Sequence, residues 1–323
     1  MSVLIYAENT GGKFKKSVFE AASYASDLAK SWNVPCVALS VGDVPASELE
    51  SLGKYGVSKV LQVTNNRLKT FVNMAYASVI ASAAKSIKAT AVVLAQTYNG
   101  RSIAPRVAVK LEAAQFSGVS SLISRHDNGF AATRGAFSGK AIEQIFTEKL
   151  PIVITVRANS YLAKESSTAC VIEDFSGEPD SNDFAIIAKE IVKASDKVSL
   201  TEADIVVSAG RGLKDPSNWG MIEELANLLG AATACSKPVA DVGWRPHHEH
   251  VGQTGIQVAP NLYFAIGISG AIQHLAGISS SKTIVAINID PEAPFFKIAD
   301  FGIVGDAFVV VPKLIEAIKA VKK

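Results

Sequence analysis

Polar side chains that could bind a ligand follow the apolar runs in the second half of the chain. Two are cations, three carry a hydroxyl or amide group, and one is a carboxylate: Arg211, Lys237, Ser236, Ser269, Asn288 and Asp306. In an open parallel sheet, ligands bind beyond the carboxyl ends of the strands, where such residues would meet. The set suits a ligand with anionic phosphates, a chain of hydroxyl groups and a heterocycle with several hydrogen-bonding edges.

The stretch GISGAIQHLAG, residues 267–277, is typical of a strand that ends in a tight turn and opens a helix. Free backbone N–H groups and the positive potential of a helix N-terminus favour a phosphate or a developing negative charge. His274 falls in the first turn, where the helix dipole opposes its protonation, and a neutral imidazole can donate one hydrogen bond to a ring oxygen. The structural alternative is that Ser269 and Gly270 only form a tight turn.

This stretch departs from the dinucleotide-binding pattern GxGxxG, because GISG at 267–270 is followed by AIQ at 271–273. Asp290 lies about 20 residues later, where a ribose-binding acid would be expected. The sequence therefore gives a nicotinamide site only weak support.

A separate loop, HVGQTG at 250–255, places Gln253 and Thr254 between two glycines, which let the backbone approach a ligand closely. The residues just before it are rich in metal-ligand types: His247, His248, Glu249 and His250. Four adjacent residues rarely converge on one ion, so we prefer a loop that flanks the ligand and expect no metal site.

The apolar runs around these residues predict alternating strands and helices. Strands are expected at 203–210, 230–236, 260–270, 282–290, 301–306 and 307–312. Helices are expected at 222–229, from Ala271, and from Lys313 to the end. This is the pattern of an open, doubly wound, Rossmann-like parallel sheet.

The first half shows the same alternation. Strands are expected at 2–8, 34–42, 57–64 and 89–97, with helices at 19–32 and 72–83. A hairpin follows, in which 116–124 and 130–137 flank a turn at 127–129, and 150–159 adds another strand. We expect a mostly parallel α/β sheet with an antiparallel extension. The acidic stretch 173–183 is expected to be an exposed loop, more simply a solvated face than a metal site.

Composition narrows the function classes. At 323 residues with 48% hydrophobic content, the chain is long enough for two cores. Lys and Arg number 32 against 30 Asp and Glu, with no basic block, so nucleic acid is not an expected partner. Three separated cysteines, Cys36, Cys170 and Cys235, cannot complete a disulfide framework, and we expect reduced, buried thiols, including Cys235.

The opening residues lack the pattern of a signal or transit peptide, and no apolar run reaches the length of a membrane span. We therefore expect a protein that is not embedded in a membrane. The expected location is a bacterial cytoplasm, or the mitochondrial matrix if the chain is eukaryotic and processed.

Several motifs resemble one known family. LYFAIGISGAIQHLAGISSSKTIVAINID, SAGRGL, VGQTG and PEAPFFKIADFGIVGD are similar, in order and spacing, to the electron transfer flavoprotein α subunit. NGRSIAPRVA and PIVITVRAN extend a looser resemblance into the first half. The resemblance implies an FAD-carrying subunit that pairs with a β subunit. Such a heterodimer passes electrons from flavin dehydrogenases, such as the acyl-CoA dehydrogenases of fatty acid β-oxidation, to a membrane quinone oxidoreductase.

The resemblance also implies which residues contact FAD. They are Arg211, Ser236, Lys237, Val251, Gly252, Gln253, Thr254, Ser269, Gly270, Ala271, Ile272, Gln273, His274, Asn288, Asp306 and Ala307. It places Gln253 and Thr254 near the redox edge of the flavin and His274 at the pyrimidine end. Asn288 and Asp306 match positions near the adenosine half.

Lys237 departs from the family, which usually has an arginine directly after the matching serine. That arginine lies over the flavin, where its charge favours anionic reduced forms. Lysine keeps the charge but replaces a planar, stacking guanidinium with a compact ammonium. We therefore expect the anionic semiquinone still to form here, but to be less stabilised than in a Lys237→Arg variant.

These features predict two domains: residues 1–194 as an α/β scaffold for the partner subunit, and residues 195–323 as the FAD-binding domain. The expected function is electron transfer without a substrate of its own, so the chain is not expected to be an enzyme. The alternatives are an NAD- or FAD-dependent oxidoreductase that acts directly on a small molecule, and a structural nucleotide-binding module. No catalytic dyad or triad in the sequence supports an oxidoreductase.

Overall fold

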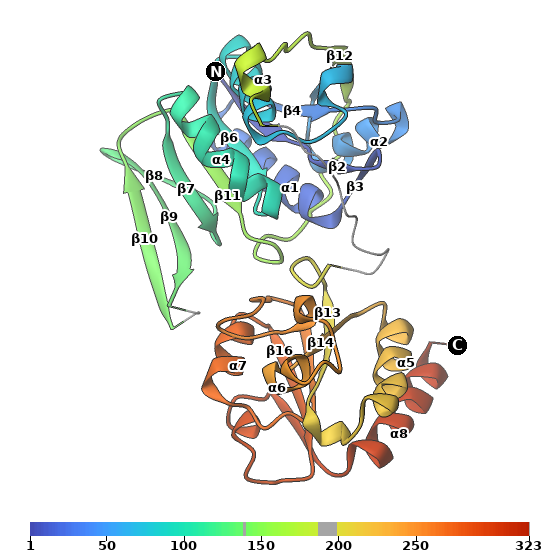
Figure 1. Cartoon of the computed structure of the whole chain (residues 1–323). Helices are drawn as coiled ribbons and strands as arrows, with labels where there is room; N and C mark the ends of the chain where they lie inside the picture. Colours follow the sequence, from blue (N-terminus) through green and yellow to red (C-terminus); the bar gives the residue numbers. More distant parts are fainter. Residues whose placement is uncertain (138–139, 187–198, 323) are drawn as a thin grey trace. The chain divides into compact units, whose positions relative to one another are not determined.

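The computed structural model describes residues 1–137, 140–186 and 199–322. The chain divides into two compact units, each with its own parallel sheet (Figure 1). The N-terminal unit comprises Met1–Gly135 and Ile142–Lys193, and the C-terminal unit Ala136–Ala141 and Ala194–Lys323. The boundary predicted near residue 195 lies outside the described residues, so it stays a prediction.

A seven-stranded sheet forms the centre of the N-terminal unit. In spatial order its strands are β12 (Val171–Asp174), β5 (Lys59–Val63), β4 (Cys36–Val41), β1 (Ser2–Tyr6), β6 (Ala89–Ala95), β11 (Ile152–Val156) and β7 (Ala114–Val119). Every neighbouring pair is parallel. The chain builds outward from β1 in one direction through β4 and β5, then crosses to the other side with β6.

Helices cover both faces of this sheet, which explains why β1 is apolar at each position from Val3 to Tyr6. Val3 and Ile5 join the core under α1 (Lys16–Trp32) and α2 (Ala46–Ser51). Leu4 and Tyr6 join the core under α3 (Asn73–Ser86) and α4 (Tyr98–Lys110). Alternate side chains of a strand point to opposite faces, so a strand covered on both faces needs apolar residues at every position.

Helix α4 has no counterpart among the predicted helices. Thr97 caps it by accepting a hydrogen bond from the amide of Gly100 at 2.9 Å. Ile103 and Val107 are buried one turn apart. Pro105 lies inside the helix, and because proline usually ends a helix, it hid the helical period.

The hairpin turn predicted at 127–129 is present, but the predicted first arm at 116–124 is wrong. Residues 116–119 belong to β7 of the parallel sheet, and only Ser124 of that arm lies in the hairpin. β8 (Ser124–His126) and β9 (Gly129–Ala136) pair antiparallel around the turn at 127–128, and β10 (Ala141–Thr147) completes a sheet ordered β10-β9-β8. These strands form the antiparallel extension as a sheet of their own, since all seven strands of the main sheet are parallel. A two-stranded ribbon joins β2 (Asn9–Thr10) to β3 (Lys13–Phe14).

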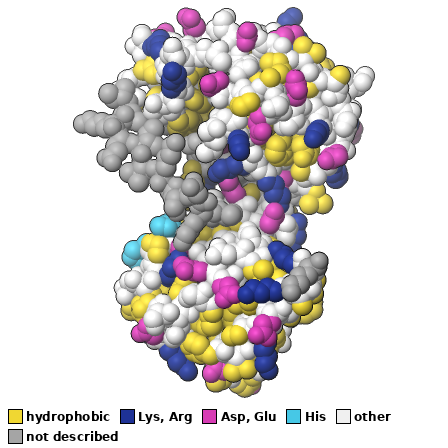
Figure 2. Space-filling model, turned by 90° about the vertical axis from the view of Figure 1, so that its right-hand side faces the viewer, with side chains coloured by type: hydrophobic (Ala, Val, Ile, Leu, Met, Phe, Trp, Pro, Cys, Tyr) yellow, Lys and Arg dark blue, Asp and Glu magenta, His cyan; other side chains and the backbone are white. Residues whose placement is uncertain are grey.

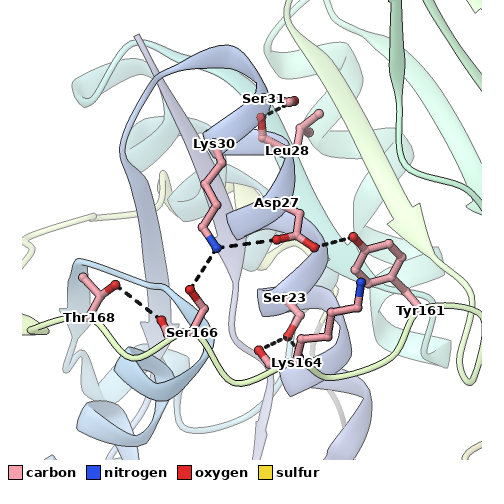
Figure 3. A network of polar contacts seen from close by, with 9 residues as sticks. All are labelled: Ser23, Asp27, Leu28, Lys30, Ser31, Tyr161, Lys164, Ser166 and Thr168. Carbon is pink, nitrogen blue, oxygen red and sulfur yellow. Dashed lines mark hydrogen bonds and ion pairs between the residues drawn. The ribbon is translucent and has the colours of Figure 1, made fainter.

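The segment that connects β11 to β12 runs in an extended form across helix α1 (Figure 3). Side-chain hydrogen bonds hold it there. The hydroxyl of Tyr161 donates to Asp27 Oδ2 at 2.6 Å. Lys30 Nζ donates to Ser166 Oγ at 2.8 Å and lies 3.6 Å from Asp27 Oδ1. Helix α1 therefore fixes the path by which the chain reaches the far edge of the sheet.

The prediction of an exposed loop throughout 173–183 is wrong at both ends. Its last residues belong to the 3-10 helix η3 (Ser181–Phe184), in which Asp183 is buried, and its first two belong to a strand. Glu173 and Asp174 end strand β12, which pairs with β5, and Lys59 Nζ lies 2.7 Å from Glu173 Oε1. Strand β12 lies at the edge of the sheet, where side chains remain exposed to solvent. An edge strand can therefore contain charged residues such as Glu173 and Asp174.

The C-terminal unit contains a five-stranded parallel sheet. In spatial order its strands are β14 (Ala232–Cys235), β13 (Ile205–Ala209), β15 (Leu262–Ile266), β16 (Thr283–Asn288) and β17 (Phe301–Val304). Its helices are α5 (Gly220–Leu229), α6 (Lys237–Asp241), α7 (Ile272–Ile278) and α8 (Ala307–Val321). With two cores on opposite faces, this is the expected doubly wound fold.

The prediction of a strand at 307–312 and a helix from Lys313 is wrong, because α8 begins at Ala307. Asp306 caps it, with Oδ1 accepting a hydrogen bond from the amide of Phe308 at 3.0 Å. Ala307, Val311 and Ile315 recur every four residues and are buried against the sheet. Packing of this helical stripe outweighs the strand preference of three consecutive valines.

The short 3-10 turns are η1 (Leu52–Tyr55), η2 (Asn66–Leu68), η3 (Ser181–Phe184), η4 (Arg211–Leu213), η5 (Pro216–Trp219), η6 (His247–Glu249) and η7 (Pro294–Lys297). On the face drawn in Figure 2, basic and acidic side chains are interspersed. Across the described ranges, no helix combines the length and the apolar character needed to cross a bilayer.

Candidate functional site

The C-terminal sheet has a topological switch point between β13 and β15. From β13 the chain first adds β14 on one side, then β15 and its successors on the other. Crossover connections leave in opposite directions at such a point, which opens a crevice at the carboxyl ends of the two strands. Arg211 follows β13 directly after Gly210, and Ser269 and Gly270 follow β15.

Backbone contact between glycines joins the loops that follow these strands. The amide of Gly210 donates to Ile266 O at 2.9 Å, and that of Gly212 donates to Gly267 O at 3.1 Å. A Cβ on Gly210 would lie 2.3 Å from Gly267 O, and one on Gly212 would lie 2.7 Å from Gly267 Cα. Only glycine allows this approach, so the two loops form one continuous backbone surface with the exposed Arg211 between them.

The turn after β15 is also closed by a glycine. Gly270 has φ +92°, and a Cβ there would lie 2.6 Å from the amide nitrogen of Phe295, which donates to Ser269 O at 3.1 Å. Ala271 is the N-cap of α7 and offers no side-chain acceptor, while Ile272 and Gln273 are exposed. Ser269 and residues 271–273 are therefore exposed beyond the carboxyl end of β15, while Gly270 is buried between them.

His274 lies behind this edge and is only 6% exposed. Its Nε2 is hydrogen bonded to the hydroxyl of Tyr263 at 2.9 Å, and its ring meets Phe295 edge-on. Burial, assisted by the nearby His250, lowers the pKa of His274 to about 4. The imidazole is therefore neutral at physiological pH, as predicted, but through burial rather than the helix dipole.

The loop at 250–256 is fastened to both neighbouring elements. The amide of Val251 donates to Cys235 O at 3.0 Å, and that of Gln253 donates to Gln273 O at 2.7 Å. A Cβ on Gly277 would lie 2.5 Å from the amide nitrogen of Gly252, so the loop packs directly on α7. Gln253 is exposed at the same edge as the first turn of α7, and Thr254 is exposed beside it.

Ser236 and Lys237 follow β14. The buried Ser236 donates its amide to Ala209 O at 3.1 Å, next to the switch point. Lys237 Nζ donates to Asp241 Oδ2 at 2.7 Å, and this bond is the main cause that lowers the pKa of the Asp241 carboxyl. Asp241 was not among the predicted site residues, although its four-residue spacing from Lys237 on a helix is a recognisable signal.

Asn288 and Asp306 follow β16 and β17, and both have local structural roles. Asn288 Nδ2 donates to Ile268 O at 3.0 Å, which ties β16 to the turn after β15. Gly305 donates its amide to Asn288 O at 2.9 Å, so Asp306 and the buried Ala307 begin α8 beside it. Asp290 accepts from the amide of Glu292 at 2.9 Å and so stabilises a turn.

The histidine-rich segment before the loop has a structural ion pair at its centre. Arg245 forms two bonds of 2.7 Å with the buried Glu249 and a third of 2.9 Å with Glu223, and its guanidinium lies 5.4 Å from the centroid of the Trp219 ring. In the part of the chain that is described, no three His, Cys, Asp or Glu residues are grouped to hold a metal ion. Cys235 and Cys36 are buried as predicted, and burial raises the pKa of the Cys235 thiol to about 12. The prediction is wrong for Cys170, which is only partly buried.

The structure thus brings the loops after all five strands, with the 250–256 loop, to one edge of the sheet. Sequence reasoning missed the residues beneath that edge, Tyr263 and Phe295. Both read as ordinary apolar core positions, and only the fold shows that they support His274 and the turn at Gly270.

Comparison with known proteins matches both halves. A model described as electron transfer flavoprotein domain matches residues 3–179, and one described as electron transfer flavoprotein FAD-binding domain matches residues 199–279. The electron transfer flavoprotein subunit alpha of Bacillus subtilis is 36% identical over 318 residues, covering 98% of this chain and 97% of that protein. The subunit of the same name from Pseudomonas aeruginosa is 38% identical over 321 residues, covering 98% and 100%.

A third relative has a different name. The lactate dehydrogenase (NAD(+),ferredoxin) subunit LctC of Acetobacterium woodii is 33% identical over 325 residues, covering 98% of this chain and 77% of that protein.

The residues at the crevice fit FAD. Gly210 and Gly212 pack on the backbone of Gly267, which holds the loops after β13 and β15 together and leaves Gly212 exposed at the switch point, where a pyrophosphate would bind. Cations, hydroxyl groups and exposed amides line the same edge, as phosphates, a ribityl chain and a flavin ring require. The chain belongs to the electron transfer flavoprotein α-subunit family, binds FAD, and has the role of an electron transfer flavoprotein.

Proposed function

We propose that FAD binds across the β13–β15 switch point and contacts the sixteen residues predicted from the sequence. The observation that carries this proposal is the backbone contact of Gly210 and Gly212 with Gly267, because it joins the loops after β13 and β15 at the point where the strand order reverses. When bound, FAD supplies the electron-accepting ring, while the chain's own residues hold and orient it and tune its electrostatic surroundings.

A glycine pair tests this placement. In Gly212→Ala the new Cβ would meet Gly267 Cα at 2.7 Å, whereas Gly220→Ala places its Cβ in open space. We expect the first variant to bind FAD at least about tenfold more weakly and the second to bind as the wild type does. FAD affinity from flavin fluorescence, with circular dichroism as a check of folding, separates the outcomes. Equal affinities of a folded Gly212→Ala variant and the wild type would place the cofactor elsewhere.

We propose further that the chain pairs with an electron transfer flavoprotein β subunit, with the N-terminal unit as the scaffold for that partner. In this heterodimer FAD accepts electrons from flavin dehydrogenases, such as acyl-CoA dehydrogenases, and releases them to a membrane quinone oxidoreductase. The α-subunit family supports the β partner, and the names of the close relatives support the carrier role. The cytoplasmic location stays a prediction.

Electron transfer can be followed without a small-molecule substrate. The purified complex is mixed with an acyl-CoA dehydrogenase and its acyl-CoA, and bleaching of the flavin absorbance of the complex is recorded. We expect bleaching only when the dehydrogenase is present. Bleaching by a small molecule alone would favour the alternative, an oxidoreductase that acts directly on its own substrate.

A further inference from the structure

His250 fills the space beneath the loop that carries Gln253 and Thr254. It is 8% exposed, and its ring lies against two glycines of its own loop. A Cβ on Gly255 would lie 2.8 Å from His250 Nδ1, and one on Gly252 would lie 3.2 Å from His250 Nε2. The turn is therefore wrapped around the imidazole, and the two glycines leave the room that the ring occupies.

The backbone of the turn closes over the same ring. Ile256 donates its amide to His250 O at 2.8 Å, and Gly252 donates to Ile256 O at 3.2 Å. Because Gln253 is bonded to the backbone of Gln273, a displacement of the ring would be transmitted to both the turn and the start of α7. The position of the exposed Gln253 and Thr254 therefore depends on a side chain that is itself buried.

The surroundings of His250 make protonation of its neutral ring unfavourable. Burial is the main cause that lowers its pKa; Lys237 of α6 and His247 of η6 lower it further, and only Asp241 of α6 raises it. His274 of α7 is coupled to it, since His250 lowers the pKa of His274. A proton on His250 would place a charge and a second N–H donor in a space bounded by two glycine Cα atoms.

We propose that His250 is a positioning residue that holds the 251–255 turn against FAD while its ring is neutral and releases the turn when the ring is protonated. This inference rests on the proposed FAD site, because it assumes that Gln253 and Thr254 contact the cofactor. It goes beyond that site, since it makes the affinity for FAD dependent on pH through a residue that does not contact FAD.

Hydrogen exchange of the full-length chain tests the inference with and without FAD. Exchange of the segment 250–258 is compared at about pH 8 and about pH 5.5, after correction for the intrinsic pH dependence of exchange. In the wild type we expect the corrected rate without FAD to rise by more than about threefold at the lower pH, and the FAD affinity to fall by a similar factor. His250→Gln, which does not titrate, should remove both changes. His248→Gln, an exposed neighbour, should retain them.

An unchanged corrected rate in the wild type would overturn the inference without any variant. So would a His250→Gln protein whose pH response equals that of the wild type. If FAD binds but its affinity does not follow loop exchange, the inference fails and the proposed site stands. If FAD binds without slowing exchange of 250–258 at any pH, the proposed site fails, and the measurements without FAD still show whether His250 controls the turn.

Discussion

The buried His274 should make the C-terminal unit lose stability in mild acid. In the unfolded chain its imidazole binds a proton below its ordinary pKa of 6.5, whereas in the folded unit it does so only below about 4. Between these values the unfolded state binds more protons, so the free energy of unfolding falls as the pH is lowered. The contribution is fully present above pH 6.5 and is lost as the pH approaches the folded pKa.

The size of the loss follows from the two pKa values. The full shift corresponds to about 3.4 kcal/mol, at about 1.36 kcal/mol for each pKa unit. Of this, about 2 kcal/mol should be lost between about pH 8 and about pH 5, before most carboxylates titrate. His274→Gln keeps a polar group near the Tyr263 hydroxyl and does not titrate, so its stability should fall by about 2 kcal/mol less over the same range.

Urea unfolding followed by tryptophan fluorescence measures this difference. Trp219 and Trp244 both lie in the C-terminal unit, and a Trp32→Phe background removes the signal from the N-terminal unit. His250 is present in both proteins, so the difference between them reports the titration of His274 together with its coupling to His250. Equal losses of stability in the wild type and His274→Gln between these pH values would refute the assignment of a neutral, acid-resistant imidazole.

Three further substitutions test other features. Lys237→Arg should raise the flavin midpoint potential by about 10–20 mV for two electrons, from about 0.5–1 kcal/mol of added cation–π stabilisation of anionic reduced forms; a redox titration with equal potentials contradicts this. Arg245→Ala leaves the buried Glu249 without its bidentate partner and should cost about 3 kcal/mol of stability in chemical denaturation, whereas Arg245→Met with Glu249→Leu should lose much less. Asp306→Ala removes the N-cap of α8 and should cost about 1 kcal/mol without FAD, while Asp306→Asn should be nearly neutral; equal losses would dismiss the cap.

The fold was predictable where local pattern and tertiary packing agree. The central strands contain continuous apolar runs because both faces of each sheet are covered, and β1 shows this from Val3 to Tyr6. Prediction failed where packing overrides local preference. Three valines at 309–311 form part of a helix because Val311 and Ile315 must face the sheet, and Glu173 is in a strand because an edge accepts it.

The candidate site divides in the same way. Residues that follow strands, such as Arg211 and Ser269, were predictable because parallel topology brings strand ends together. The buried residues that support them, Tyr263 and Phe295, were not predictable. In the sequence they look like any other apolar core residue, and only the structure shows that they contact His274 and Gly270. Asp241 is intermediate, since helical spacing alone would have paired it with Lys237.

Because of its strand order, the N-terminal sheet cannot be completed until late in the synthesis of this unit. β6 and β7 are made early, but β11, which lies between them, begins only at Ile152, and the outer partner of β5 begins at Val171. Until then a nascent chain on the ribosome carries unpaired, apolar strand edges, and parallel pairings of such long sequence separation form slowly. We expect truncations that end before Asp174 to aggregate, and chaperones to hold this unit during its synthesis.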